Sequence, residues 1–155
     1  MTDEELSMSI PLDDDEFLRR ERPTCEREFK WLVSAEDEET EPPSGGYFCP
    51  YCGVQAPPDA WHTKAQIALA ENRMMREVVG PQLRKLEREL RGIGRASGGL
   101  VQGRMDTQLP PEADPLTETN DMRRVDFTCH PTEPVKIAEN RSQPPFCLIC
   151  GQPSA

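Results

Sequence analysis

The chain has 155 residues, of which 35% are hydrophobic and 30% are charged, and it contains 16 prolines. This length predicts a single domain, and the composition is unfavourable for a large hydrophobic core. The formal net charge of −10 disfavours nonspecific binding to DNA or to an anionic membrane. No apolar run approaches the roughly 20 residues that a membrane-spanning helix needs.

The N-terminal region is acidic. Residues 1–44 carry fifteen Asp and Glu against five Lys and Arg, and this composition predicts a largely disordered arm. Its first residues lack the basic segment of a signal peptide, so we expect a cytoplasmic protein with reduced thiols. Six cysteines in a reducing compartment indicate metal binding or redox chemistry rather than disulfide bonds. Arginine outnumbers lysine fourteen to four, which weakly suggests a bacterial genome rich in G and C.

Residues 45–151 are predicted to form one zinc-stabilised domain. It opens with a turn in residues 47–56, "YFCPYCGVQA", which contains a Cys-x-x-Cys-Gly sequence. We call Cys49–Gly53 knuckle 1 and the matching "CLICG" at Cys147–Gly151 knuckle 2. Trp61, shortly after knuckle 1, is expected to anchor the core.

A long helix is predicted over residues 64–91. Thr63 and Gln66 fit a capping box at its start. An apolar stripe of helical period then runs along it, through Ala65, Ala68, Met75, Val79, Leu83, Leu86 and Leu90. Proline at Gly80-Pro81 removes a helical hydrogen bond, so a kink or a reversal is expected there. Because the stripe keeps its phase across the break, we favour one kinked helix.

The rest of the domain is predicted to contain a flexible loop over residues 92–121, rich in Gly and Pro. A β-hairpin leading into knuckle 2 should follow, over residues 123–151. Val125, Phe127 and Cys129 alternate with polar residues, which is typical of a half-buried strand. This pattern places Cys129 on the apolar face, as a buried free thiol. Cys25 has no Cys-x-x-Cys partner and is expected to be free.

Two Cys-x-x-Cys-Gly knuckles, each preceded by Phe, suit a tetrahedral zinc ion. The passages "YFCPYCG" and "VDFTCHPTEPVKIAENRSQPPFCLICG" resemble zinc-ribbon proteins, in which two knuckles on β-hairpins hold one structural zinc. The resemblance implies a single Zn²⁺ bound by Cys49, Cys52, Cys147 and Cys150. Cys129 and His130 are alternative metal ligands. The expected fold class is α+β, with a zinc-ribbon-like β unit, an inserted long kinked helix and the disordered acidic arm.

The long spacer between the knuckles does not exclude a shared ion. Closing a loop of 94 residues in place of one of about 20 costs ~1.4 kcal/mol of chain entropy. A structural zinc contributes roughly 10–16 kcal/mol of apparent binding energy in small peptides. The ion therefore outweighs the closure cost, and a small core needs such a staple.

Three functions are considered. The first is a non-enzymatic interaction or adaptor module, which binds another protein or self-associates through the helix stripe. The second is a nucleic-acid-binding zinc ribbon using the basic helix over residues 73–95, masked by the acidic arm until displaced. Its contacts would be the basic helix face, comprising Arg84, Lys85, Arg88, Arg91 and Arg95. The alternative for these charges is a solvated face with i, i+4 ion pairs.

The third function is a thiol redox switch or a rubredoxin-like iron protein, because Cys-x-x-Cys-Gly pairs also resemble the iron knuckles of rubredoxins. The sequence gives little support for an enzymatic function. It contains only two histidines and none of the common hydrolase, metalloprotease or phosphate-loop motifs. We therefore expect no catalytic residues and no membrane association.

Overall fold

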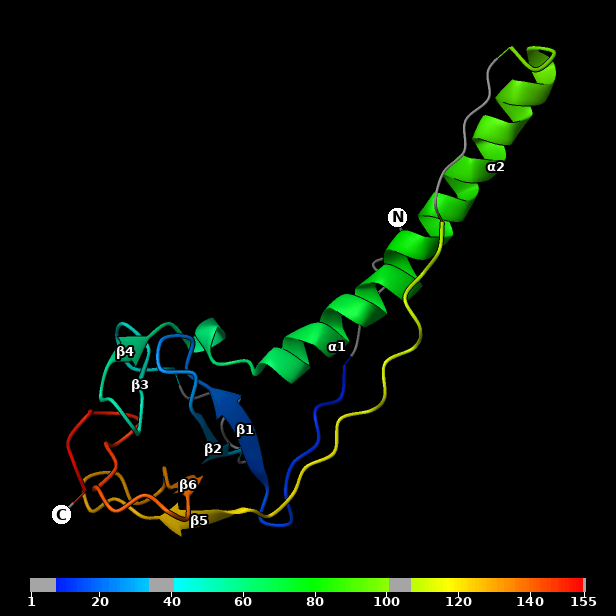
Figure 1. Ribbon diagram of the computed structural model, residues 1–155. Helices are drawn as coiled ribbons and strands as arrows, with labels where there is room; N and C mark the ends of the chain where they lie inside the picture. The colour runs from blue at the N-terminus through cyan, green and yellow to red at the C-terminus, as the bar shows by residue number, and fades with distance from the viewer. Residues whose placement is uncertain (1–7, 34–40, 101–106, 155) are drawn as a thin grey trace. The chain divides into compact units, whose positions relative to one another are not determined.

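The computed structural model describes residues 8–33, 41–100 and 107–154 (Figure 1). The fold is α+β, as predicted, with antiparallel sheets and one long helical segment. The chain divides into two compact units. A sheet unit comprises Ser9–Gln66 and the chain from Leu116 onward, and a helical unit comprises Ile67–Pro115.

The sheet unit is built on four antiparallel strands in the order β1-β2-β6-β5. Their bounds are Phe17–Glu21 for β1, Glu28–Leu32 for β2, Met122–Val125 for β5 and Val135–Ala138 for β6. The β5–β6 pair confirms the hairpin expected before knuckle 2. Two further strands, β3 (Tyr47–Phe48) and β4 (Gln55–Ala56), pair around knuckle 1.

The prediction of a disordered arm over residues 1–44 is wrong for β1 and β2, whereas residues 1–7 and 34–40 lie outside the described part. Phe17 and Phe29 are fully buried in these strands. The number of acidic residues in this region led to the wrong prediction, because counting them assumes that each charge is solvated. Arg19 pairs with Glu28 at 2.8 Å and with Glu118 at 2.7 Å, so strand charges are paired within the sheet unit.

One face of the sheet carries a buried ion-pair cluster. Lys30 and Lys136 stand opposite each other on β2 and β6, and both contact Asp13 Oδ2, at 3.1 and 2.8 Å. Burial alone would raise the pKa of Asp13, but hydrogen bonds from Lys136, the Phe17 amide and Lys30 lower it to about 2. Lys30 also contacts Glu118 at 2.9 Å, and Lys136 also contacts Asp15 at 2.6 Å. Removing the carboxylate that the two buried lysines share would break one ion pair of each, which is destabilising.

The opposite face of the sheet packs an aromatic core against the knuckles. Phe29 meets Trp61 edge-on at 5.6 Å between ring centroids, and Trp31 lies 5.0 Å from Tyr47. Trp61 is fully buried, which confirms its expected role as a core anchor. Val135, Phe127, Leu148 and the first cysteines of both knuckles complete the same core, so the knuckles are part of the main packing.

The long helical segment runs as α1 (Lys64–Met74), a π-helical turn (Met75–Val79) and α2 (Gly80–Ala96). The capping box is confirmed, because Thr63 and Gln66 each accept the other's backbone N–H at 3.1 Å. Gly80 N–H donates to Met75 O, five residues back. This wider turn accommodates Pro81, which has no N–H to donate. The helix therefore neither stops nor reverses at the proline.

The region predicted as a flexible loop over residues 92–121 begins as helix, since α2 continues to Ala96. After the undescribed residues 101–106, the chain returns along the helix. Asn72 donates to Pro111 O at 2.8 Å and accepts from Ala113 N at 3.1 Å, and Arg76 donates to Pro110 O at 2.7 Å. These bonds give residues 110–113 a defined path without regular secondary structure.

Candidate metal centres

The two knuckles have the same local backbone structure. In each, the glycine N–H donates to the first cysteine's carbonyl at 2.9 Å, from Gly53 to Cys49 and from Gly151 to Cys147. Gly53 has φ of 68° and Gly151 has φ of 69°, in the left-handed region that glycine adopts without strain. The Cys-x-x-Cys-Gly pattern thus predicts both turns correctly.

The knuckles also pack on each other reciprocally. Phe48 N–H donates to Leu148 O at 2.8 Å, and Phe146 N–H donates to Pro50 O at 2.9 Å. Each phenylalanine precedes the first cysteine of its own knuckle, and each acceptor follows the first cysteine of the other knuckle. The two turns are therefore related by an approximate internal twofold.

The cysteines nevertheless form two groups rather than the single group of four that the sequence suggested. Knuckle 2 joins Cys129 and His130, and we call Cys129, His130, Cys147 and Cys150 the Cys3His group. Knuckle 1 joins Cys25, and we call Cys25, Cys49 and Cys52 the three-cysteine group. Within each group the ligand atoms all lie within 4.8 Å of one another. The spacing of two identical knuckles could not reveal these additional members.

The Cys3His group has distances that suit a tetrahedral zinc. Cys150 Sγ lies 3.5 Å from Cys129 Sγ, and Cys147 Sγ lies 3.5 Å from His130 Nδ1. Ligands at about 2.0–2.3 Å from a tetrahedral ion stand about 3.3–3.8 Å apart. Three sulfurs and one imidazole nitrogen make a complete set for a structural zinc site. The structure thus brings the predicted alternative ligands, Cys129 and His130, to knuckle 2.

Cys129 is exposed, so the expected buried free thiol on an apolar strand face is wrong. Strand β5 ends at Val125. The alternation that holds for Val125 does not extend to Cys129, and a turn carries Cys129 and His130 toward Cys147. A Cys-His dipeptide 17 residues before a knuckle was the signal that pointed to this arrangement.

The three-cysteine group gathers residues from two segments. Cys25 lies between β1 and β2, and its Sγ stands 3.8 Å from Cys49 Sγ. Cys49 is buried, Cys25 is half-buried and Cys52 is exposed. Cys25 is a free cysteine, as expected, but it lies beside knuckle 1. No sequence motif links Cys25 to knuckle 1, since only the β1–β2 hairpin brings them together.

The thiols of each knuckle differ in their ionisation. Burial raises the pKa of Cys49 to about 12 and that of Cys147 to about 11. The pKa of the Cys150 thiol is lowered, and the largest cause is the hydrogen bond from the Gln152 backbone N–H. For Cys52, burial opposes ionisation, but the Val54 amide and other neighbours lower the pKa. Because metals bind thiolates, metal uptake must displace the protons of the two buried thiols.

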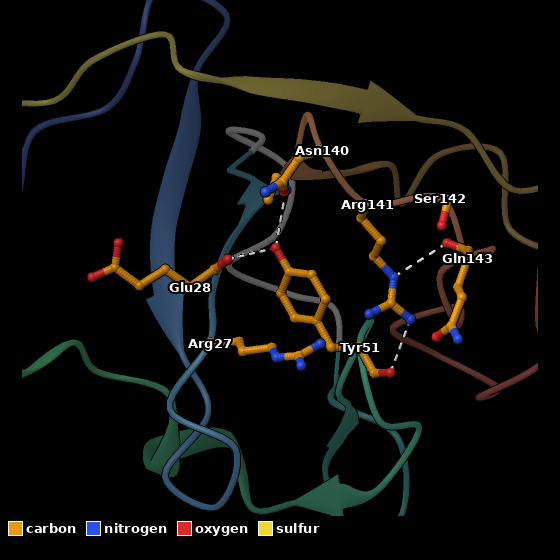
Figure 2. Close-up of a pocket in the computed structure, with 8 residues that line it drawn as sticks. Arg27, Glu28, Tyr51, Asn140, Arg141, Ser142 and Gln143 are labelled. Carbon is orange, nitrogen blue, oxygen red and sulfur yellow. Dashed lines mark hydrogen bonds between the residues drawn. The ribbon is translucent and has the colours of Figure 1, made fainter.

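A pocket of about 490 Å³ lies beside knuckle 1. Figure 2 shows Tyr51 at its centre, with Arg27 and Arg141 within 5.7 and 4.9 Å of the ring centroid. The Tyr51 hydroxyl donates to Glu28 O and accepts from Ala138 N, and Arg141 donates to Tyr51 O at 3.0 Å. These bonds tie knuckle 1 to strands β2 and β6, so the pocket wall has a structural role.

All five residues of the basic helix face are exposed on α2. Of the expected i, i+4 pairs, Glu87–Arg91 forms at 2.6 Å. Among the described residues, no helix is both long and apolar enough to cross a membrane.

Comparison with known proteins gives no assignment. No protein-family model, no curated protein and no solved structure matches the chain significantly. The likeness to zinc ribbons rests on the knuckles themselves, and function has to be argued from the site.

Proposed function

We propose that this protein is a non-enzymatic interaction module whose sheet unit is stabilised by a structural zinc ion in the Cys3His group. The observation that carries the proposal is the convergence of four ligand atoms within 4.8 Å. Three thiolates and an imidazole are typical ligands of structural zinc. A full protein ligand set leaves no coordination position for a substrate, which favours a structural ion over a catalytic one.

The ion would fasten knuckle 2 to the sheet. Cys129 and His130 follow β5, whereas knuckle 2 follows β6. Knuckle 2 contributes Cys147 and Leu148, at 0% and 2% exposure, to the core. Zinc bound across these segments would hold this part of the core in place, in the manner of small domains that need a metal to fold.

The helical segment supplies the surface for a protein partner in this proposal. Its apolar stripe remains partly exposed, with Met75 at 38% and Leu86 at 44%. An apolar helix stripe is stabilised by burial against another element. The partner is proposed to be another protein or a second copy of the chain.

A second candidate function is nucleic-acid binding by the basic helix face, and its specific support is the exposure of all five residues on α2. Clustered arginines on one helix can neutralise several phosphates. Masking by the acidic region is not part of this candidate, because β1 and β2 pair their charges within the sheet unit.

The test of the proposed function compares Cys129→Ser with wild type. This variant keeps both knuckles intact, so a single ion shared by Cys49, Cys52, Cys147 and Cys150 would remain bound. A Cys3His zinc predicts one fewer zinc per chain by native mass spectrometry and a lower unfolding temperature. Thr128→Ala, at the exposed neighbouring position, is the matched control and should keep both properties. Unchanged zinc content in Cys129→Ser would refute the proposal.

A further inference from the structure

The three-cysteine group has the spacing of a metal site but a different ligand set from the Cys3His group. Its Cys25 and Cys49 sulfurs lie 3.8 Å apart, which is the edge of a tetrahedron of sulfurs about 2.3 Å from a zinc ion. We propose that Cys25, Cys49 and Cys52 bind a second zinc ion whose fourth coordination position is open to an exchangeable ligand.

A buried arginine beside the group supports this assignment. Arg22 is only 4% exposed, and its Nη1 lies 3.8 Å from Cys52 Sγ. Its other hydrogen bonds go to neutral acceptors, Val54 O and Thr24 Oγ1. Across residues 8–33, 41–100 and 107–154, no carboxylate forms an ion pair with Arg22.

The charge balance explains why an arginine is placed there. Burying an unpaired guanidinium is costly. A zinc ion with three thiolates carries a net charge of −1, which the Arg22 guanidinium neutralises. The metal-bound group thus provides the counter-charge that the surrounding carboxylates do not.

The open position follows from the ligand count. Within the described chain, no fourth Cys, His, Asp or Glu joins this group. His62, the other histidine, instead has its Nδ1 3.1 Å from Arg20 Nη1. Cys52 is exposed, so solvent reaches the group on that side. Three protein ligands with an exchangeable fourth are the arrangement of an open zinc site.

The chemistry of the group also indicates what the open position takes. Water would fill it by default. Imidazole nitrogens and thiolates bind zinc well. We therefore assign the position to an exogenous thiolate or imidazole, from a small molecule or from a partner's side chain.

The inference does not depend on the Cys3His zinc, and metal counting separates the two. Native mass spectrometry of the full chain should give two zinc ions for wild type, one for Cys25→Ser, one for Cys129→Ser and none for the double variant. A single ion in wild type that Cys25→Ser retains would overturn the second site. A single ion that Cys129→Ser retains would instead refute the Cys3His proposal.

Cobalt substitution tests the open position. Cys129→Ser combined with Cys150→Ser leaves only two ligands in the Cys3His group. Co²⁺ loaded into this protein is therefore held by the three-cysteine group, and added imidazole or 2-mercaptoethanol should change its visible absorption. Cys25→Ser loaded with Co²⁺ reports on the Cys3His group and should not respond. An unresponsive spectrum of the Cys129→Ser, Cys150→Ser protein would show that the fourth position is closed and would overturn that part of the inference.

A second variant keeps the test decisive if Cys25→Ser fails to fold. Arg22→Gln retains all three ligands and removes the guanidinium. Its Co²⁺ affinity at the three-cysteine group should fall by about 10- to 100-fold, the range seen when outer-shell partners of metal ligands are removed. Arg27→Gln, which alters an exposed arginine nearby, is the matched control. Equal affinities in the two variants would overturn the role of Arg22 and the charge argument with it.

Discussion

The reciprocal packing of the knuckles can be tested at Gly151. A Cβ built on Gly151 would lie 2.7 Å from Cδ1 of Phe48, and one built on Gly53 would lie 3.2 Å from the Phe146 ring. Each phenylalanine therefore covers the glycine of the other knuckle. We predict that Gly151→Ala destabilises the sheet unit more than Gly53→Ala.

The expected loss in the free energy of unfolding has two parts. Alanine in the left-handed region costs roughly 1–2 kcal/mol relative to glycine, and this part applies equally to both positions. Overpacking of a filled site adds about 1–3 kcal/mol. This second part should be about 1–2 kcal/mol at Gly151, where the Phe48 ring must shift further, and small at Gly53, where the ring must move by a few tenths of an ångström. We therefore expect a loss of about 2–4 kcal/mol for Gly151→Ala and about 1–2 kcal/mol for Gly53→Ala.

The assay is thermal unfolding of the zinc-loaded protein followed by near-UV circular dichroism, which reports on the aromatic core. At about 2–4 °C per kcal/mol for a chain of this size, Gly151→Ala should lower the transition by roughly 5–15 °C. Gly98→Ala is the control, because Gly98 has φ of 66° and no atom within 4 Å of a built Cβ. It shares the backbone strain without the clash, and it lies at the end of α2 in the helical unit. Equal effects of Gly151→Ala and Gly98→Ala would refute the knuckle packing.

Three further predictions follow from the sheet and the helix. Asp13→Asn should lower the free energy of unfolding in urea at pH 7 by about 3 kcal/mol, because it leaves two buried lysines without their shared carboxylate. Asp15→Asn, at an exposed pairing site, should lower it by less than about 1 kcal/mol. Similar losses of stability in the two variants would contradict the buried cluster. If the stripe mediates self-association, Leu83→Glu with Leu86→Glu should convert an oligomer to a monomer in light scattering, and a monomer in both proteins would exclude it. If α2 contacts phosphates, Arg88→Glu should weaken RNA binding and reduce its salt dependence by about one ion, whereas no binding by wild type at low salt would exclude that function.

The Asp13 cluster also predicts the direction of acid sensitivity. The pKa of Asp13 is lowered to about 2 in the folded protein from an ordinary value near 3.9. A depressed carboxyl pKa stabilises the fold above the ordinary value and loses that contribution as the pH falls toward 2. The difference in stability between wild type and Asp13→Asn should therefore shrink between about pH 4 and pH 2. A difference that is constant across this window would show that Asp13 acts by packing and not by charge.

Local patterns predicted local structure well. Thr63 and Gln66 marked the start of the helix because a capping box is completed within four residues. The knuckles were recognisable because ligand spacing and the following glycine determine the turn. The β5–β6 hairpin was recognisable from strict alternation. In each case the residues that specify the structure are close in sequence.

Long-range arrangement could not be predicted in the same way. Strands β1 and β2 were missed because their charges are neutralised by residues about a hundred positions away, as in the contact of Arg19 with Glu118. Cys25 was missed as a metal ligand for the same reason, since it reaches Cys49 only once β1 and β2 pair. The number of charges and the spacing of cysteines along the chain do not predict contacts between residues that are far apart in sequence.

Two identical knuckles predicted one shared ion, whereas the structure places their cysteines in two separate groups. The internal twofold accounts for the similarity of the two turns without a shared ion. The same symmetry could arise around a single shared metal, but here the backbone bonds from Phe48 to Leu148 and from Phe146 to Pro50 join the turns directly. Cys49 and Cys147 both have 0% exposure within one core. An ion bound at either proposed site would therefore stabilise packing that the other group also uses. Any ion that binds only the folded state adds to stability through its own affinity, so a variant that has lost one ion should unfold at a lower temperature and still bind the other.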